Sequence, residues 1–382
     1  MKHYDYIMAG GGLAGLSLAC RLARSTLRAR PILVIDHADK SKHDRTFSFW
    51  SQEPDLFASA TSRSWRRLRV VGRQGERCLD LGEYSYHTMR GGDFYRCARR
   101  IMERFGAVEF LDAHIDTIED GDRTATVRMD DALVQGTWVF DSTLTPGYPA
   151  MASGNSATRL NLSFLGWEVE TEHDVFEPDV VTFMDFRTPQ NGDLRFFYVL
   201  PFSPNRALVE YTAFTDARLS GAEARSALEA YLQDVFEVNT FDVVSREGGC
   251  LPITDASFPR RLGRRVMAIG VKGGLLKPST GYAYTRVQAD SEAIVASLLT
   301  RGHPFDVPAS DPSYRWLDTV MLRVMARHGG EMHTIMETLL ARNPIGRVLS
   351  FLDESSSPLD ILQIMASLPP SRFIEAALLN HQ

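Results

Sequence analysis

Three features are scarce in this sequence, and each scarcity excludes a class of protein. The 382 residues include only four cysteines, Cys20, Cys78, Cys97 and Cys250, whose spacing fits neither a zinc site nor a disulfide framework. We therefore expect no bound metal and a reducing, cytoplasmic location. No run of 18 apolar residues occurs, so the pattern predicts no membrane-spanning helix, although peripheral membrane contact stays open. Basic residues do not outnumber acidic ones, and the net charge of −6 predicts no general affinity for nucleic acid.

The rest of the composition is that of a water-soluble globular protein, with 44% hydrophobic and 24% charged residues. A chain of this length can form two or three domains, each with its own core. Nothing in the composition indicates an oligomeric state. The function must therefore be sought in particular segments.

The most informative segment is rich in glycine. A short apolar strand runs into Gly10, Gly12 and Gly15, and the chain then continues as a helix. In such a unit the first glycine permits a tight turn, the second lets a pyrophosphate approach the backbone, and the third lets the helix pack on the strand. The helix N-terminus adds free N–H groups and the positive end of its dipole.

A second apolar run, residues 31–35, ends in Asp36, about 20 residues after Gly15, where a carboxylate can bind ribose hydroxyls. Strand, helix, second strand and acidic end together predict a dinucleotide-binding unit. An ordinary glycine-rich turn of an α/β protein is the alternative. The position of the unit at the start of the sequence favours FAD over NAD, by analogy with flavoproteins that open in this way.

The order of the remaining segments predicts that a second domain interrupts the first. We expect an irregular stretch over residues 40–58, whose aromatic residues either line a site or cover the core. Alternating residues predict a sheet rich in aromatics beyond residue 155, followed by a helix at 222–235. A late strand, a loop at 273–282 and a helix at 283–300 then return to the first domain, and residues 313–382 read as helices broken at prolines.

These patterns predict an α/β protein with a Rossmann-like FAD-binding domain, an inserted antiparallel-sheet substrate domain and C-terminal helices. The predicted FAD domain is discontinuous and comprises residues 1–58, 93–150 and 248–302. Residues 59–92 and 151–247 form the predicted substrate domain, and residues 303–382 the helical region.

Several segments resemble the lycopene cyclases, flavoproteins that close the ends of a linear carotenoid. The segments that carry the resemblance are MDFR (184–187), YVLPFS (198–203), ALVEYT (207–212), EGGCLPI (247–253), KPSTGY (277–282), NP (343–344), FLDE (351–354) and MASLP (365–369). They occur in order along nearly the whole chain. The sequence departs from the family pattern at three places. Tyr211 follows Glu210 where a second carboxylate is common, Arg45 and Phe47 flank a threonine where histidine and tryptophan are common, and Lys272 stands where alanine is common.

The resemblance implies a hydroxylase-type flavoprotein fold and a cyclisation without net redox change, in which reduced FAD is the working cofactor and NADPH or NADH supplies its electrons. It also implies a hydrophobic polyene substrate. Besides the glycine-rich unit and Asp36, the expected FAD contacts are Arg45 and a loop with Pro278, Thr280 and Gly281. The loop is expected because a loop before a late helix commonly brings backbone N–H groups to the flavin in such proteins.

The implied chemistry needs a carboxylic acid that keeps its proton near neutral pH, and Glu210 is the expected acid. Burial would raise its pKa, and Tyr211 could assist as a hydrogen-bond donor. The alternative is that Glu210 is a cross-strand ion-pair partner. Aromatic faces that stabilise the carbocation and bind substrate are expected from several residues. These candidates are Phe49, Trp50, Trp167, Phe183, Phe196 and Tyr211, each of which could instead be core.

Three other functions remain open at this point. The chain could be an FAD-dependent monooxygenase, which would share the fold. It could cyclise a shorter prenylated natural product, or bind flavin without catalysis. The sequence does not identify the base that takes the final proton, and exposed apolar residues on the C-terminal helices would favour substrate extraction from a bilayer.

Overall fold

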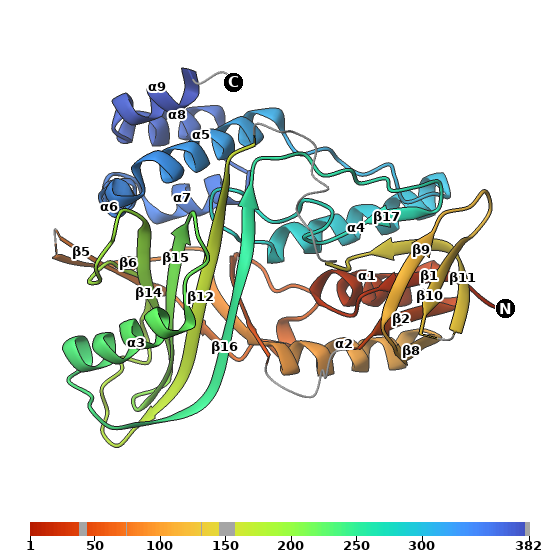
Figure 1. The fold of residues 1–382 in the computed structure, drawn as a ribbon, viewed down its shortest axis with the longest axis horizontal. Helices are drawn as coiled ribbons and strands as arrows, with labels where there is room; N and C mark the ends of the chain where they lie inside the picture. Colours follow the sequence, from red (N-terminus) through yellow and green to blue (C-terminus); the bar gives the residue numbers. More distant parts are fainter. Residues whose placement is uncertain (38–43, 74, 131, 145–156, 379–382) are drawn as a thin grey trace. The chain divides into compact units, whose positions relative to one another are not determined.

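The computed structural model describes residues 1–37, 44–73, 75–130, 132–144 and 157–378 (Figure 1). The chain forms two compact units, each assembled from three separate segments. Unit 1 comprises Met1–Lys42, Gly91–Asn155 and Ala256–Ser310. Unit 2 comprises His43–Arg90, Ser156–Asp255 and Asp311–Gln382.

Unit 1 is built on a seven-stranded sheet in the order β8-β2-β1-β11-β10-β9, with β17 beside β11. Strands β8, β2, β1, β11 and β17 run parallel, whereas β10 and β9 complete the sheet as an antiparallel meander. The strands are β1 (Lys2–Ala9), β2 (Ile32–Asp36), β8 (Val108–Asp112), β9 (Ile115–Glu119), β10 (Ala125–Met129), β11 (Ala132–Asp141) and β17 (Val266–Ala268).

The helices of unit 1 cover its parallel strands. They are α1 (Leu13–Arg24), α2 (Gly91–Phe105) and α4 (Tyr284–Arg301), and α1 packs against both of the others. Strand β2 and the second half of β1, residues 6–9, are almost continuously apolar because a parallel sheet is covered on both faces. This arrangement places the start of α1 at the carboxyl ends of β1 and β2.

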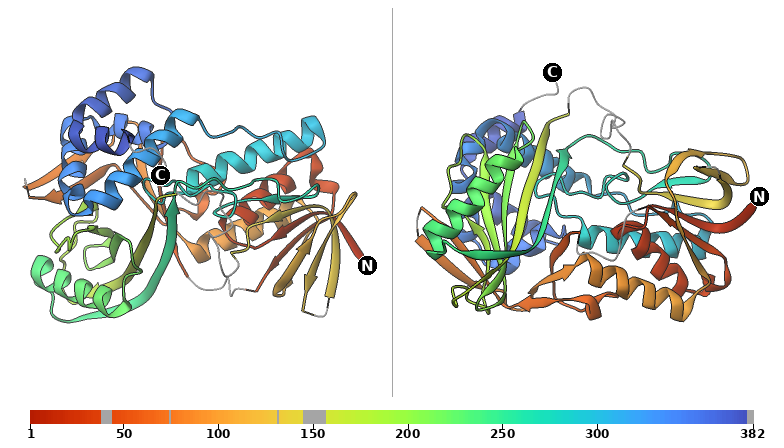
Figure 2. Two further views of the ribbon diagram at one scale, coloured as in Figure 1. Left: turned by 45° about the horizontal axis from the view of Figure 1, so that its top comes forward. Right: turned by 60° about the horizontal axis from the view of Figure 1, so that its bottom comes forward.

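Unit 2 contains a second seven-stranded sheet, in the order β16-β12-β15-β14-β13-β5-β6, and a three-stranded sheet, β3-β7-β4. Strand β12 lies between β15 and β16 and pairs antiparallel with both (Figure 2). The strands are β3 (Thr46–Ser51), β4 (Arg63–Trp65), β5 (Arg67–Gly72), β6 (Gly75–Asp80), β7 (Ser85–Arg90), β12 (Arg159–Thr171), β13 (Val181–Asp185), β14 (Leu194–Ser203), β15 (Arg206–Thr215) and β16 (Phe241–Thr254).

Helix α3 (Gly221–Phe236) covers one face of this large sheet. Its buried residues Leu228, Tyr231 and Leu232 share a core with Trp167 and Tyr211 from the sheet. Successive residues of a strand point to opposite faces, so the residues between these core positions point away from α3. Gly166 on β12 and Glu210 on β15 therefore lie on the face that α3 leaves free.

Proline and capping residues divide the C-terminal region of unit 2 into helices. The side chain of Asp311 accepts a hydrogen bond at the start of α5, and Ser357 does the same at α8, with proline following each cap. The helices are α5 (Pro312–His328), α6 (Met332–Arg342), α7 (Ile345–Leu352), α8 (Pro358–Ser367) and α9 (Pro370–Leu378). The expectation that prolines break this region into helices is confirmed, because Pro344 precedes α7 and Pro358 and Pro370 begin α8 and α9.

The structure corrects two expectations about the course of the chain. Residues 46–51 are not irregular but form β3, because this segment pairs with β7 along its whole length. The same pairing places residues 44–58 with unit 2 and not with the predicted FAD domain. Residues 40–43 of the expected irregular stretch lie outside the described residues.

Strand pairing also moves the second boundary. Residues 248–254 continue β16 and pair with β12, so they belong to unit 2. The helices from residue 311 onward belong to this unit as well, because α5 and α6 contact its strands. The compact units are therefore interleaved more closely along the chain than the sequence analysis expected.

Candidate active site

The glycine-rich turn of unit 1 joins β1 to α1 and has the backbone that phosphate binding requires. Gly10 has φ of +107°, and a Cβ there would meet Ser142 Oγ at 2.3 Å. A Cβ at Gly15 would lie 2.0 Å from the Gly10 carbonyl oxygen, so only glycine allows this contact between helix and turn. Gly12 faces open space, and as the N-cap residue of α1 it has no side chain that could bond the first N–H groups. The turn therefore leaves a cradle in front of the first helical N–H groups.

Asp36 stands beside this turn at the end of β2. Its Oδ2 atom accepts a hydrogen bond of 2.6 Å from the backbone N–H of Gly11. This bond fixes the carboxylate next to the glycine cradle, where ribose hydroxyls lie in a dinucleotide-binding unit. The residues present fit a bound dinucleotide.

The second part of the predicted loop at 273–282, residues 277–282, forms a tight turn immediately before α4. The Gly281 N–H donates to the Lys277 carbonyl at 2.8 Å, and Gly281 has φ of +77°. Pro278 and Thr280 lie in this turn and are half-buried. Arg45 is not part of unit 1, since it precedes β3 in unit 2 and forms an ion pair of 2.8 Å with Asp44. Its predicted contact with FAD stays untested.

The most unusual feature of unit 2 is a pair of glutamates that meet across a glycine. In the register of the sheet, Gly166 on β12 stands opposite Glu210 on β15 and opposite Glu247 on β16. A Cβ at position 166 would lie 3.1 Å from the Glu247 Cγ atom and 3.5 Å from the Glu210 Cβ atom. Because glycine leaves this space free, the two carboxyl groups form a hydrogen bond with each other.

Threonine hydroxyls complete the surroundings of the pair. Thr212 Oγ1 donates to Glu210 Oε1 at 3.1 Å, and Thr46 Oγ1 on β3 donates to Glu247 Oε2 at 2.7 Å. Within the described part of the chain, neither glutamate forms an ion pair with a lysine or arginine. A third glutamate on the same face, Glu168, instead pairs with Arg90 and with Arg206. The alternative role of a cross-strand ion-pair partner thus falls to Glu168 and not to Glu210.

These surroundings raise the pKa of both carboxyl groups. Burial is the main cause at Glu210 and raises its pKa to about 8, with a further contribution from the neighbouring charge of Glu247. Burial also raises the pKa of Glu247, to about 7, while the hydrogen bond from Thr46 opposes the shift. The two groups titrate as a pair, and near neutral pH the pair holds a proton.

Aromatic rings extend from the pair along the same face of the sheet. Tyr198 stands directly opposite Glu210 on β14, and its ring contacts Phe196 at 5.1 Å and Phe183 at 5.8 Å between centroids. Phe183 and Phe196 are buried, whereas Tyr198 is partly exposed. Two of the predicted aromatic residues therefore lie near the acid, but the ring directly beside it, that of Tyr198, is not among the predicted ones.

Four other predicted substrate contacts lie elsewhere. Trp167 and Tyr211 are in the core under α3, and the Tyr211 hydroxyl contacts Arg195 at 3.3 Å. The expectation that Tyr211 assists Glu210 is wrong, because adjacent strand residues point to opposite faces. Phe49 packs on His87, and Trp50 Nε1 donates to Asp353 at 2.7 Å, so both are buried through contacts within unit 2.

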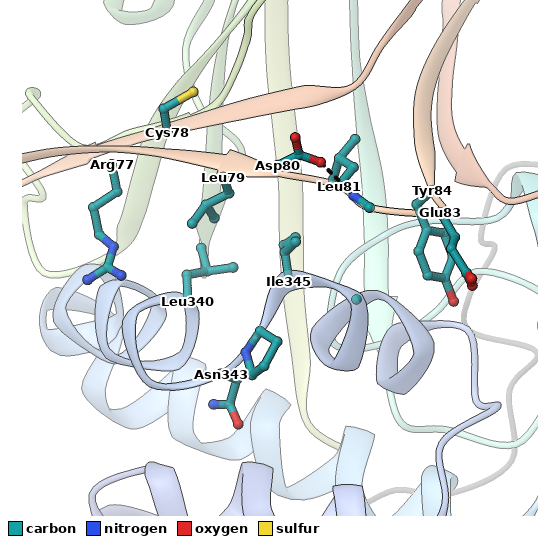
Figure 3. Close-up of a pocket in the computed structure, with 13 residues that line it drawn as sticks. Arg77, Cys78, Leu79, Asp80, Leu81, Glu83, Tyr84, Leu340, Asn343 and Ile345 are labelled. Carbon is teal, nitrogen blue, oxygen red and sulfur yellow. Dashed lines mark hydrogen bonds between the residues drawn. The ribbon is translucent and has the colours of Figure 1, made fainter.

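A separate pocket of about 540 Å³ opens in unit 2 between β6 and the helices α6 and α7 (Figure 3). Leu79, Leu340 and Ile345 provide apolar parts of its lining. None of the predicted site residues lines it, and β14, β13 and β5 separate it from the strand of Glu210.

Comparison with known proteins identifies the family. The model of the lycopene cyclase protein family matches residues 5–378. The chain belongs to the lycopene cyclase family. It is 28% identical to a lycopene beta-cyclase of Paracoccus sp. (strain N81106 / MBIC 01143), in an alignment that covers 96% of this chain and 94% of the relative. It is 29% identical to the lycopene beta-cyclase of Pantoea ananas, over 77% and 74% of the two chains.

This lycopene cyclase family member has the same fold as a flavoprotein of known structure. The crystal structure of the flavin-dependent monooxygenase PieE in complex with FAD and substrate superimposes with a TM-score of 0.63 at 14% identity. The match covers 98% of this chain and 72% of PieE. The predicted α/β architecture with a Rossmann-like FAD-binding fold is confirmed.

The carboxyl pair predicts how stability changes with pH. Both pKa values are raised above the ordinary 4.5 in the folded state, so the stability that the pair contributes is complete below 4.5 and is lost as the pH rises through about 7 and 8. Replacing both glutamates by glutamine removes this dependence. We expect the variant to gain stability relative to the wild type between about pH 5 and pH 9, by an amount on the order of a few kcal/mol.

Thermal unfolding midpoints of wild type and Glu210→Gln/Glu247→Gln, measured across this range, check the prediction. Glu172→Gln, at an exposed position just beyond β12, is the matched control and should follow the wild type. A difference between wild type and double variant that does not change with pH would show that the pair is not protonated at neutral pH.

Proposed function

We propose that this protein closes a terminal ring on a linear carotenoid by acid-initiated cyclisation without net redox change, with Glu210 as the acid. The observation that carries the proposal is the position of Glu210, which meets the carboxyl group of Glu247 across Gly166 on a sheet face shared with aromatic rings, and this setting raises its pKa. Membership of the lycopene cyclase family supports the substrate class. We propose that the ring is a β-ring, because the relatives are named lycopene beta-cyclases.

The reaction begins when the carboxyl proton of Glu210 passes to a terminal carbon–carbon double bond. The resulting tertiary carbocation is attacked by the neighbouring double bond, a six-membered ring closes, and a proton leaves the ring. A carboxylic acid can act in this way only if it is uncharged at the working pH, and general acid catalysis is then worth about 10²- to 10⁴-fold in rate.

The positive charge that develops must be stabilised without a nucleophile that would trap it. The ring of Tyr198 is partly exposed beside Glu210 and can offer its face to the cation. Such contacts contribute about 0.5–2 kcal/mol each. Phe183 and Phe196 pack against this ring in edge-to-face contacts.

Unit 1 is the proposed FAD-binding unit. Gly10, Gly12 and Gly15 would receive the pyrophosphate at the start of α1, Asp36 would bind ribose hydroxyls, and the turn containing Pro278, Thr280 and Gly281 would contact the flavin. When bound, reduced FAD supplies an electron-rich ring system that stabilises positive charge, and NADPH or NADH is the proposed source of its electrons.

Removing the Asp36 carboxylate should weaken FAD retention. Asp36→Ala deletes a charged hydrogen-bond acceptor, which typically contributes about 1.5–3 kcal/mol and corresponds to roughly 10- to 100-fold in affinity. Flavin content per purified protein and FAD titration of the apoprotein measure the effect. Asp112→Ala is the control, because Asp112 pairs with Asp36 in the register of β2 and β8 but has no bond to the glycine turn. Unchanged FAD affinity in Asp36→Ala would remove this residue from the cofactor site.

Glu210→Gln should abolish cyclisation while FAD binding stays normal. The assay supplies lycopene in detergent or liposomes under nitrogen, with FAD reduced by dithionite, and detects cyclised product. Wild type should form product without oxygen, and Glu210→Gln should be slower by at least about 100-fold. Full activity of the variant would exclude Glu210 as the acid.

The same assay separates the competing functions. Product formation that depends strictly on oxygen, with matched NAD(P)H consumption, would instead identify a monooxygenase, which is the activity named for the structural relative PieE. Turnover of shorter prenylated compounds but not of lycopene would change the proposed substrate and leave the role of Glu210 intact.

We also propose that α8 and α9 contact a membrane surface, because a polyene resides in the bilayer. No helix in the described residues is long and apolar enough to cross one. Leu359, Leu362 and Met365 recur every three residues along α8 and are exposed, and Ile374 and Leu378 form a similar stripe on α9. Figure 1 shows both helices beyond α5 at the C-terminal end of unit 2. Exposed apolar stripes of this kind are typical of helices that lie in a lipid interface.

Polar substitutions on this stripe should weaken lipid binding. Leu359→Ser/Leu362→Ser removes two leucines, each worth about 1.5–3 kcal/mol when buried, so binding to liposomes should fall by at least about tenfold. Co-sedimentation with liposomes measures this change. Cyclisation should slow when lycopene is supplied in liposomes but not when it is supplied in detergent. Val244→Ser changes an exposed apolar residue of β16 and should behave as wild type. Equal binding by both variants would exclude the stripe as the contact.

A further inference from the structure

We propose that Glu247 is the positioning residue of the acid: across Gly166 it accepts the hydrogen bond that keeps the reactive proton on Glu210. The proposal deepens the cyclase function proposed above and depends on it for the fate of the proton. The observation behind it is a geometric one, since two flanking strands place their carboxyl groups on either side of a residue that has no side chain.

The register fixes which residue can act as the partner of Glu210. The next residue along the chain, Tyr211, lies on the opposite face under α3, and a carboxylate at that position would lie there too. Glu247 is distant in sequence but shares the face of Glu210 and is hydrogen-bonded to it. The like-charge neighbour that hinders ionisation of Glu210 is therefore on another strand.

The hydrogen bonds around the pair differ in length, and the difference indicates which carboxyl carries the charge. Thr46 donates to Glu247 at 2.7 Å, while Thr212 donates to Glu210 at 3.1 Å. A shorter bond from a hydroxyl stabilises an ionised acceptor more strongly. Glu247 is thus the better site for the negative charge, and the shared proton resides on Glu210.

Two other acidic residues near the pair already form ion pairs with arginines. Glu168 on β12 pairs with Arg90 and Arg206, and Asp44, which precedes β3, pairs with Arg45. The negative charges of Glu168 and Asp44 add to the raised pKa of Glu247, and they oppose the effect of Thr46 without removing it. Glu210 and Glu247 are therefore the groups in this cluster whose proton can move without breaking an ion pair.

This arrangement explains which group supplies the proton at the start of the reaction and which group accepts a proton at its end. When the O–H bond of Glu210 breaks and its proton joins the substrate carbon, two adjacent carboxylates remain, and their repulsion gives the pair a high affinity for a proton. Ring closure ends with loss of one proton from carbon, which a carboxylate oxygen of the pair can accept. The pair then holds one proton again, and no electron has been gained or lost.

Titration of Glu210 in the holoprotein without substrate tests the inference independently of cyclisation. Infrared difference spectra report the protonated carboxyl stretch, and Glu210→Gln identifies the contribution of Glu210. In Glu247→Gln the midpoint of Glu210 should fall by about one pH unit or more, because the neighbouring charge is gone. In Thr46→Val the charge on Glu247 loses its hydrogen bond, so the proton should move toward Glu247 and the carboxyl signal of Glu210 should weaken near neutral pH.

The pH dependence of kcat/KM provides the second readout. For wild type the alkaline limb reports loss of the shared proton, and in Glu247→Gln it should move to lower pH by the same interval as the infrared midpoint. In Glu247→Asp, which keeps the charge, the alkaline limb should lie between those of Glu247→Gln and the wild type. Glu172→Gln should change neither readout.

A Glu210 midpoint that stays the same in Glu247→Gln would overturn the inference, even if wild type is an active cyclase. A protein that shows the infrared shift but no cyclisation of any polyene would retain the carboxyl pair and overturn the proposed function instead. If Glu247→Gln folds poorly, Thr46→Val becomes the deciding variant. Its expected change also arises from the negative charge on Glu247. An unchanged Glu210 signal in Thr46→Val would then count against the pair.

Discussion

The register of three neighbouring strands is the constraint on which the rest of the site depends. Glu210, Gly166 and Glu247 meet because β15, β12 and β16 pair without a shift at this level of the sheet. A slip of one residue would turn Glu210 into the core under α3 and bring Tyr211 out. The apolar contacts of α3 with Trp167 and Tyr211 prevent that slip, because they bury this face of β12, β14 and β15. The packing on one face thereby fixes the chemistry on the other.

The three glutamates on the free face show how one environment can give two kinds of carboxyl group. Glu168 has two arginine partners, Arg90 and Arg206, which supply the positive charge that a buried carboxylate needs. Glu210 and Glu247 have hydroxyl donors and each other. Hydroxyl groups satisfy the hydrogen bonds of a carboxyl without supplying a positive charge, so the cost of burying a charge remains and a proton is retained. A glutamate with arginine neighbours therefore has a structural role, whereas a glutamate with threonine neighbours can keep a proton.

The sequence allowed some of this to be predicted and not the rest, for a physical reason. The glycine cradle, Asp36 and the turn before α4 are local in the chain, and their backbone requirements are visible as residue types. Glu247 could not be placed, because β16 joins β12 on the side away from β15 and nothing in the sequence states that order. Tyr211 is a different case. The alternation of side chains along a strand already excluded it as a neighbour of Glu210, and the same alternation indicated that the partner must come from another strand.

The fold alone does not separate the proposed cyclase from an oxygen-dependent flavoenzyme. PieE, a monooxygenase by name, shares the architecture over nearly this whole chain at 14% identity. Function must therefore be argued from side chains, and the carboxyl pair is the feature with chemical consequences of its own. Protonating a hydrocarbon requires an acid that still holds its proton at the working pH, and partial burial without a cationic partner among the described residues raises the pKa of Glu210 and Glu247 toward that requirement. In the proposed cyclisation, the glycine that brings the two carboxyl groups together, between threonines and beside a tyrosine ring, would provide such an acid.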